Sequence, residues 1–171
     1  MIGPQALAEK FCFGENIYDV DAAIWRQAFQ LIDENAHFVF SKNRIHSLWI
    51  ESGGHLRRKI RDDALILRVL KRALPGYVGP VLKLYRGECR FLFNSNQIGF
   101  CWTPDLSVAE RFARGLNALE SGGVLLQAIV PPEAVLAPPN EHSANYLGEH
   151  EYTCNPTLLQ ELEVLREYAK L

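Results

Sequence analysis

Three short segments of the chain carry side chains that could do chemistry, and the first is Tyr85-Arg86-Gly87. A guanidinium at the end of a strand can hold a phosphate through parallel hydrogen bonds, and a glycine beside it lets a ligand approach the main chain. The segment therefore suits an anion-binding site. Taken alone, it is better explained as a surface arginine before a turn.

The second segment runs from Cys101 to Ala113 and predicts a strand, a turn and a helix. The strand ends at Thr103, so a hydroxyl lies beside the turn. Val108 and Phe112 repeat at helical spacing in the part that follows. The alternative is a purely structural unit whose apolar side chains belong to the core. The helix is expected to pack in this way whether or not the segment also forms a site.

The third segment is Gly148-Glu149-His150-Glu151. On a strand, Glu149 and Glu151 would lie on the same face. Two adjacent carboxylates repel, so the pKa of one of them rises unless a cation lies nearby. Such a pair is costly in a core strand and useful in a site. An exposed edge strand with both carboxylates in water is equally compatible with the sequence.

The elements that position these segments change character at one place. The run from Pro75 to Pro80 holds two prolines and two glycines, which predicts a stop and a turn. Before it, apolar residues at helical spacing predict a helix opened by Asp19 or Asp21 and another over residues 41–50. A single apolar stripe also predicts one long helix over residues 56–74.

After Pro80 the chain is predicted to form strands over residues 81–87, 98–103, 124–130 and 149–154. The third of these is apolar enough to be buried on both faces. Ser107-x-x-Glu110 predicts a capping box for the helix before it. The tail from Thr157 is predicted to be a helix, with a strand over residues 161–168 as the alternative. Helices followed by strands indicate an α+β fold.

In this order, the three segments resemble the mono-ADP-ribosyltransferase family, in its arginine–serine–glutamate branch of bacterial toxins and phage enzymes. Thr103 follows Arg86 by 17 residues, and Glu151 follows Thr103 by 48. The resemblance covers about residues 80–156. It implies a split β-sandwich with N-terminal helices, in which NAD lies in the cleft between two sheets.

The resemblance also implies roles for the NAD-binding residues. Arg86 would hold the phosphates and ribose of NAD, and the main chain of Gly87 would meet the nicotinamide carboxamide. Phe112 would flank the nicotinamide ring, although core packing explains it equally well. The family's serine–threonine–serine triplet falls on residues 101–103. Thr103 keeps a hydroxyl there, whereas Cys101 replaces the serine that supports the catalytic glutamate, and a thiol is the weaker donor.

For the reaction itself, the resemblance implies that Glu151 is the catalytic carboxylate and binds the 2′-hydroxyl of the nicotinamide ribose. Glu149 would orient the acceptor, which in this branch is an arginine of a target protein. Tyr146 resembles the aromatic residue by which such loops meet that protein. NAD would be the substrate, and no metal would be needed. The alternatives are an NAD glycohydrolase, with water as acceptor, and a catalytically degenerate, protein-binding module.

Composition sets the remaining expectations. With 171 residues, 48% of them apolar and 22% charged, we expect a single domain over residues 1–171, helical over 1–76 and strand-rich over 80–171. A net charge of −2 argues against nucleic-acid or membrane partners. The N-terminus lacks a signal-peptide pattern, which favours a cytoplasmic protein and is compatible with a toxin or effector acting inside a host cell. The four cysteines are expected to be free thiols.

Overall fold

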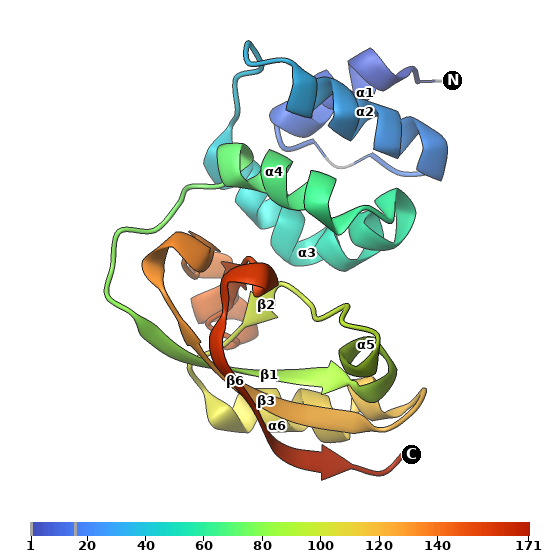
Figure 1. Ribbon diagram of the computed structural model, residues 1–171. Helices are drawn as coiled ribbons and strands as arrows, with labels where there is room; N and C mark the ends of the chain where they lie inside the picture. The colour runs from blue at the N-terminus through green and yellow to red at the C-terminus, as the bar shows by residue number, and fades with distance from the viewer. Residues whose placement is uncertain (1, 16) are drawn as a thin grey trace. The chain divides into compact units, whose positions relative to one another are not determined.

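The computed structural model describes residues 2–15 and 17–171. The chain divides into two compact units, Met1–Pro75 and Gly76–Leu171. The first is helical, and the second contains antiparallel sheets, which confirms the predicted α+β class (Figure 1). Among the described residues, no helix is both long and apolar enough to cross a membrane.

The described residues of the first unit form four helices: α1 (Pro4–Cys12), α2 (Ala22–Glu34), α3 (Lys42–Ile60) and α4 (Asp63–Ala73). Helix α2 confirms the helix predicted after Asp21, and α3 includes the one predicted over residues 41–50. Their apolar faces meet in a buried core. At its centre the rings of Phe11, Trp25 and Phe29 contact one another, with centroid separations of 4.8–6.3 Å.

The single long helix predicted over residues 56–74 is wrong, because α3 and α4 are separate helices. Arg61 takes a left-handed conformation with φ of 52° and ends α3. The Asp62 carboxylate then accepts the N–H of Leu65 and caps α4. Arg57 forms an ion pair with Asp63 across the break. Apolar residues continue at helical spacing through the break because each of the two helices buries one face.

The second unit contains two three-stranded antiparallel sheets. In one, β3 (Gly123–Val130) lies between β1 (Leu82–Cys89) and β6 (Gln160–Tyr168). In the other, β5 (Tyr152–Cys154) lies between β2 (Cys101–Trp102) and β4 (Val135–Ala137). As predicted, β3 is buried on both faces over most of its length. Helices α5 (Arg90–Asn94) and α6 (Leu106–Arg114) connect the strands.

The two sheets touch at one point and then diverge. Tyr85 of β1 exchanges two main-chain hydrogen bonds with Thr103, of 2.8 and 2.9 Å, just beyond the end of β2. Past this bridge, β1 continues along β3 while β2 pairs with β5. Buried side chains of Leu84, Trp102 and Leu126 belong to the core on which both sheets pack. The divergence leaves the edge of β1 beyond Tyr85 unpaired by β2.

Three other sequence predictions for this unit are wrong in detail. The tail after Thr157 forms strand β6 rather than a helix, because residues 160–168 pair with the free edge of β3. The strand predicted over 149–154 begins only at Tyr152, so Glu149 and Glu151 lie in the loop before it. The cap of α6 is Asp105 rather than Ser107, since its carboxylate accepts the N–H groups of Ser107 and Val108.

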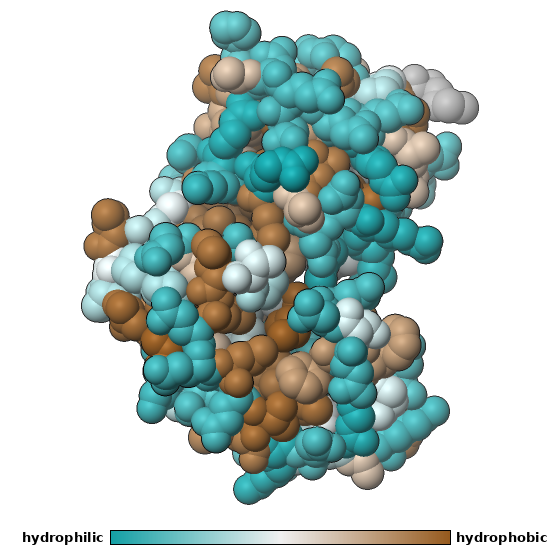
Figure 2. Space-filling view, viewed as in Figure 1, coloured by the Kyte–Doolittle hydropathy of each residue, from teal (hydrophilic) through white to brown (hydrophobic). Residues whose placement is uncertain are grey.

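Strand β6 leaves apolar surface on the second unit. Every residue from Gln160 to Glu167 is exposed, and Leu162, Val164 and Leu165 are among the exposed large apolar side chains. Apolar residues gather over this unit on the face seen in Figure 2.

Candidate functional site

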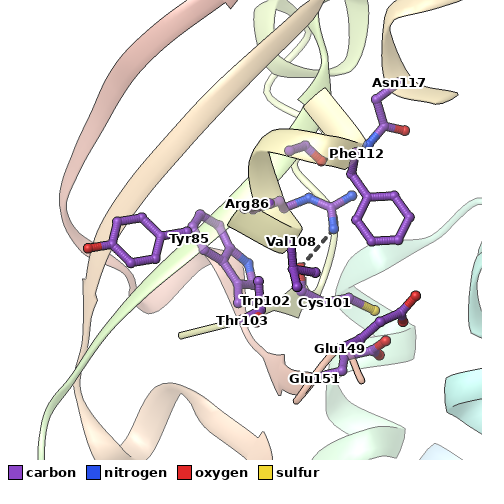
Figure 3. A pocket seen from close by; sticks show the side chains of 12 residues that line it. Tyr85, Arg86, Cys101, Trp102, Thr103, Val108, Phe112, Asn117, Glu149 and Glu151 are labelled. Atoms are coloured by element: carbon purple, nitrogen blue, oxygen red, sulfur yellow. Dashed lines mark hydrogen bonds between the residues drawn. The ribbon is translucent and has the colours of Figure 1, made fainter. Parts of the chain in front are cut away.

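A cavity of about 330 Å³ opens where the two sheets diverge. Its size is within the range of small-molecule sites. Strands β1 and β2, helix α6 and the loop before β5 line it (Figure 3). The lining residues are Tyr85, Arg86, Gly87, Cys101, Trp102, Thr103, Val108, Ala109, Phe112, Asn117, Glu149 and Glu151. All the site residues expected from the sequence are among them except Tyr146.

Arg86 projects from β1 and is held firmly. Its Nε donates to Glu88 Oε2 at 2.7 Å, and its Nη1 donates to the carbonyl of Cys101 at 2.8 Å (Figure 3). Only 18% of its side chain is exposed. A Cβ on Gly99 would overlap the guanidinium, so glycine at this position makes room for it. Burial acts to lower the pKa of Arg86, but the charge and hydrogen bond of Glu88 raise it overall.

Glu88 was missed by sequence reasoning, although it fixes Arg86. It is almost completely buried and accepts N–H groups from Gly99 and Cys89, each at 2.8 Å. Burial acts to raise its pKa, but Arg86 and the two main-chain donors lower it overall. The signal was available in Arg86-Gly87-Glu88, because alternate residues of a strand share a face and can pair there.

Gly87 presents main-chain groups to the gap between the sheets. The main-chain N–H and C=O of Tyr85 both bond to Thr103 on the β2 side of β1. Every second residue of a strand directs these groups to the same edge, so the N–H and C=O of Gly87 also point to the β2 side. The carbonyl accepts the side-chain amide of Asn117 at 2.7 Å. A Cβ on Gly87 would overlap the main chain of Ala109 and Ala113 in α6. Asn117 had no recognisable signal in the sequence, because it reaches Gly87 only through the fold.

Glu151 is the most unusual ionisable group of the cavity. Its side chain is buried, and its Oε1 has no hydrogen-bond partner among the described residues. Burial raises the pKa of Glu151 to about 7, and the nearby charge of Glu149 acts in the same direction. A hydrogen bond from Cys101 and the charge of Arg86 act to lower it. The carboxylate is therefore poised between its neutral and charged forms near neutral pH.

The Cys101 thiol points toward the two glutamates (Figure 3). Burial and the charge of Glu151 raise the pKa of this thiol well above its ordinary value, so it is a neutral donor to the carboxylate rather than a nucleophile. This is the position where the resemblance places a serine. All four cysteines of the chain carry free thiols.

The other expected site residues have different settings. The Thr103 hydroxyl accepts the N–H of Asp105 at 3.1 Å and so helps to start α6. Phe112 projects from α6 and is half-buried at the cavity (Figure 3). Tyr146 does not line the cavity: it is 85% exposed and stacks on His142, with ring centroids 5.6 Å apart. Both rings belong to the one-and-a-half-turn π-helix His142–Leu147 that precedes the glutamates.

No protein-family model matches this chain, and no curated protein or solved structure matches it either. In residues 2–15 and 17–171, no group of three or more His, Cys, Asp and Glu side chains is arranged to hold a metal ion. The cavity and its side chains are therefore the features of the chain that bear on its function.

Proposed function

We propose that this protein is an NAD-dependent mono-ADP-ribosyltransferase that breaks the nicotinamide–ribose bond and transfers ADP-ribose to an arginine of a target protein. We further propose that the second unit is the split β-sandwich of that family. The observation that carries the proposal is the cavity itself. It collects Arg86, Cys101, Phe112, Glu149 and Glu151 from separate elements at the place where two sheets part.

The charges suit the bond that would break. Cleavage leaves the electron pair with nicotinamide and develops positive, oxocarbenium-like charge on the ribose. The buried Glu151 carboxylate, once ionised, would stabilise that charge more strongly than a solvated carboxylate, because few waters screen it. Arg86 supplies the positive group for the phosphates. Glu88 holds Arg86 in place by accepting from its Nε, and the Nη1 of Arg86 donates to the carbonyl of Cys101.

The second carboxylate suits the acceptor. Glu149 lines the same cavity and is half-buried, close enough to Glu151 to raise its pKa. A carboxylate can orient a guanidinium through two parallel hydrogen bonds. The acceptor nitrogen would then form its bond to the ribose C1′ as the bond to nicotinamide breaks, and it would give up one proton to the Glu149 carboxylate and from there to water. This favours arginine as the modified residue.

The test is release of nicotinamide from NAD by the purified protein, with adenine-labelled NAD and cell extract as a source of acceptors. We expect wild-type protein to release nicotinamide and to leave label on a protein band. Glu151→Gln should lower the rate by roughly 10²–10³-fold, the usual loss of a group that stabilises transition-state charge. Glu133→Gln, an exposed carboxylate outside the cavity, is the matched control. Folded protein that releases no nicotinamide would refute the proposal.

Two alternatives predict other results, and Cys101 favours the second of them, because a thiol supports Glu151 less firmly than a hydroxyl would. One is an NAD glycohydrolase, which would release nicotinamide and leave all label in solution. The other is a module that binds a partner without chemistry. In that case Glu151→Gln would keep the biological effect of the wild-type protein.

A further inference from the structure

Ser143 is a completely buried polar residue in the π-helix ahead of the two glutamates. Its Oγ accepts the N–H of Glu151 at 2.7 Å. Its carbonyl accepts the N–H of Glu149 at 3.1 Å and that of His150 at 3.4 Å. One residue therefore satisfies three consecutive main-chain donors of the Glu-His-Glu segment.

The local conformation makes this arrangement possible. Gly148 and His150 both take left-handed φ angles, of 64° and 47°. The chain therefore curls around Ser143 instead of running on as a strand. Ser143 is itself anchored, because its N–H donates to the side chain of Asn140 at 2.9 Å.

The Glu151 side chain has little else to hold it in place. The thiol of Cys101 is the donor that reaches its carboxylate, and Oε1 has no partner among the described residues. On the other side, Tyr152 is fixed by pairing with Trp102. The position of the Glu151 side chain therefore depends on its main chain. That main chain is held on one side by the pairing of the next residue, Tyr152, with β2, and on the other side by the hydrogen bonds to Ser143.

We propose that Ser143 is a positioning residue for Glu151, fixing its main chain so that the carboxylate stays directed into the cavity. The consequence for catalysis rests on the proposed function, whereas the clamp itself does not. Ser143 would supply through the main chain much of the support that a weak thiol donor at Cys101 does not give to the carboxylate.

The test combines a structural and a kinetic measurement on the full-length protein. In Ser143→Ala the amide hydrogen of Glu151 should exchange with solvent at least about tenfold faster, because its acceptor is gone. The kcat for nicotinamide release should fall about tenfold with the KM for NAD unchanged, since the lost support acts on the transition state. Ser143→Thr keeps the hydroxyl and should restore both values toward wild type.

Ser121→Ala is the matched control, because Ser121 also accepts a main-chain N–H, that of Phe91 at 2.9 Å, and does not line the cavity. It should change neither value. If Ser143→Ala does not fold, Asn140→Ala weakens the same anchor and should change both values in the same direction.

The possible outcomes separate the two ideas. Unchanged exchange at Glu151 in Ser143→Ala would overturn the clamp. Faster exchange with a raised KM and an unchanged kcat would overturn its consequence for catalysis. Wild-type protein without nicotinamide release would instead refute the proposed function. The exchange measurement would then decide alone, with faster exchange supporting the clamp and unchanged exchange overturning it.

Discussion

Glu151 is 9% exposed as a residue, and burial of its carboxylate makes the charged form costly to the fold. Its pKa is raised from an ordinary value of 4.5 to about 7. Below about pH 4.5 it is protonated in the folded and unfolded chains alike. Between the two values the unfolded chain ionises first, so folding stability falls as pH rises, and the loss is complete above about pH 7.

Glu151→Gln should therefore stabilise the protein in a pH-dependent way. Removing the buried charge should raise the free energy of unfolding at pH 8 by up to about 3 kcal/mol relative to wild type, with little of that gain remaining at pH 4.5. Urea unfolding at both pH values measures this. Glu133→Gln, at an exposed site, serves as control. A gain of the same size at both pH values would show that buried charge is not its source.

Cys101 offers a second prediction at this scale, on the pH dependence of the reaction. In the proposed reaction ionised Glu151 is the active form, so nicotinamide release at low NAD should rise with pH through about 7. A hydroxyl is a stronger donor than a thiol, so Cys101→Ser should move the midpoint to lower pH and Cys101→Ala to higher pH. The measurement is the pH profile of kcat/KM for the three proteins. Identical midpoints would show that this side chain does not support Glu151.

At the scale of elements, helix α6 lies close to β1 because residue 87 has no side chain. An added Cβ would overlap the main chain of Ala109 and Ala113, so Gly87→Ala should force the helix away and cost about 1–3 kcal/mol of stability. Because Phe112 lines the cavity from the same helix, NAD affinity should fall as well. Chemical unfolding and NAD titration measure the two effects.

The control for Gly87→Ala is Gly54→Ala, at an exposed position inside α3 where the new Cβ would meet only the tip of Arg58, at 3.7 Å. There alanine should stabilise the protein by about 0.5–1 kcal/mol, because it lowers the entropy of the unfolded chain. Equal effects of the two substitutions would contradict the packing explanation.

The exposed loop before β5 carries a prediction about the acceptor. Tyr146 is outside the cavity, stacks on His142 and is exposed, so the two rings form an aromatic surface suited to protein contact. Tyr146→Ala should reduce labelling of the target protein about tenfold and leave nicotinamide release without acceptor unchanged. Tyr18→Ala removes another exposed tyrosine and serves as control. Equal losses in both assays would place Tyr146 in NAD turnover instead.

Elements whose structure is decided by local side-chain patterns could be predicted from the sequence, whereas elements decided by contacts with distant parts of the chain could not. Strand β3 was predictable because its apolar run reflects burial on both faces, and α2 because its apolar residues recur at helical spacing. For β6 the sequence predicted a helix with a strand over residues 161–168 as the alternative, and the alternative is confirmed because pairing with β3 decides the structure of this segment. The break at Arg61 was missed because the apolar stripe continues across it.

The same division applies to the site. Of the three residues on which the resemblance rests, Thr103 and Glu151 lie directly beside strand ends, as expected from the sequence, whereas Arg86 lies inside β1, which continues to Cys89. Glu88 could have been found from its spacing of two residues from Arg86 on a strand, whereas Ser143 acts through contacts that only the folded chain makes. Ser143 is eight residues from the amide it accepts, with two left-handed residues between them, and no spacing rule would join the two.

At the scale of the whole molecule, each compact unit has its own buried core, with Phe29 at the centre of one and Leu126 in the other. All the residues that line the cavity lie in the second unit, between Tyr85 and Glu151. Domains with separate cores commonly unfold in separate steps. We therefore expect two calorimetric transitions, of which only the one belonging to the second unit responds to NAD.

Two core substitutions assign these transitions. Phe29→Ala should lower only one transition by more than about 10 °C, since such truncations cost about 3–5 kcal/mol and each kcal/mol shifts a small domain by several degrees. Leu126→Ala should lower only the other, and NAD should raise that one. Below the first transition, Phe29→Ala should keep the nicotinamide release of wild type, because no cavity residue lies in its unit. A single transition lowered by both substitutions would mean that the 171 residues unfold as one cooperative domain.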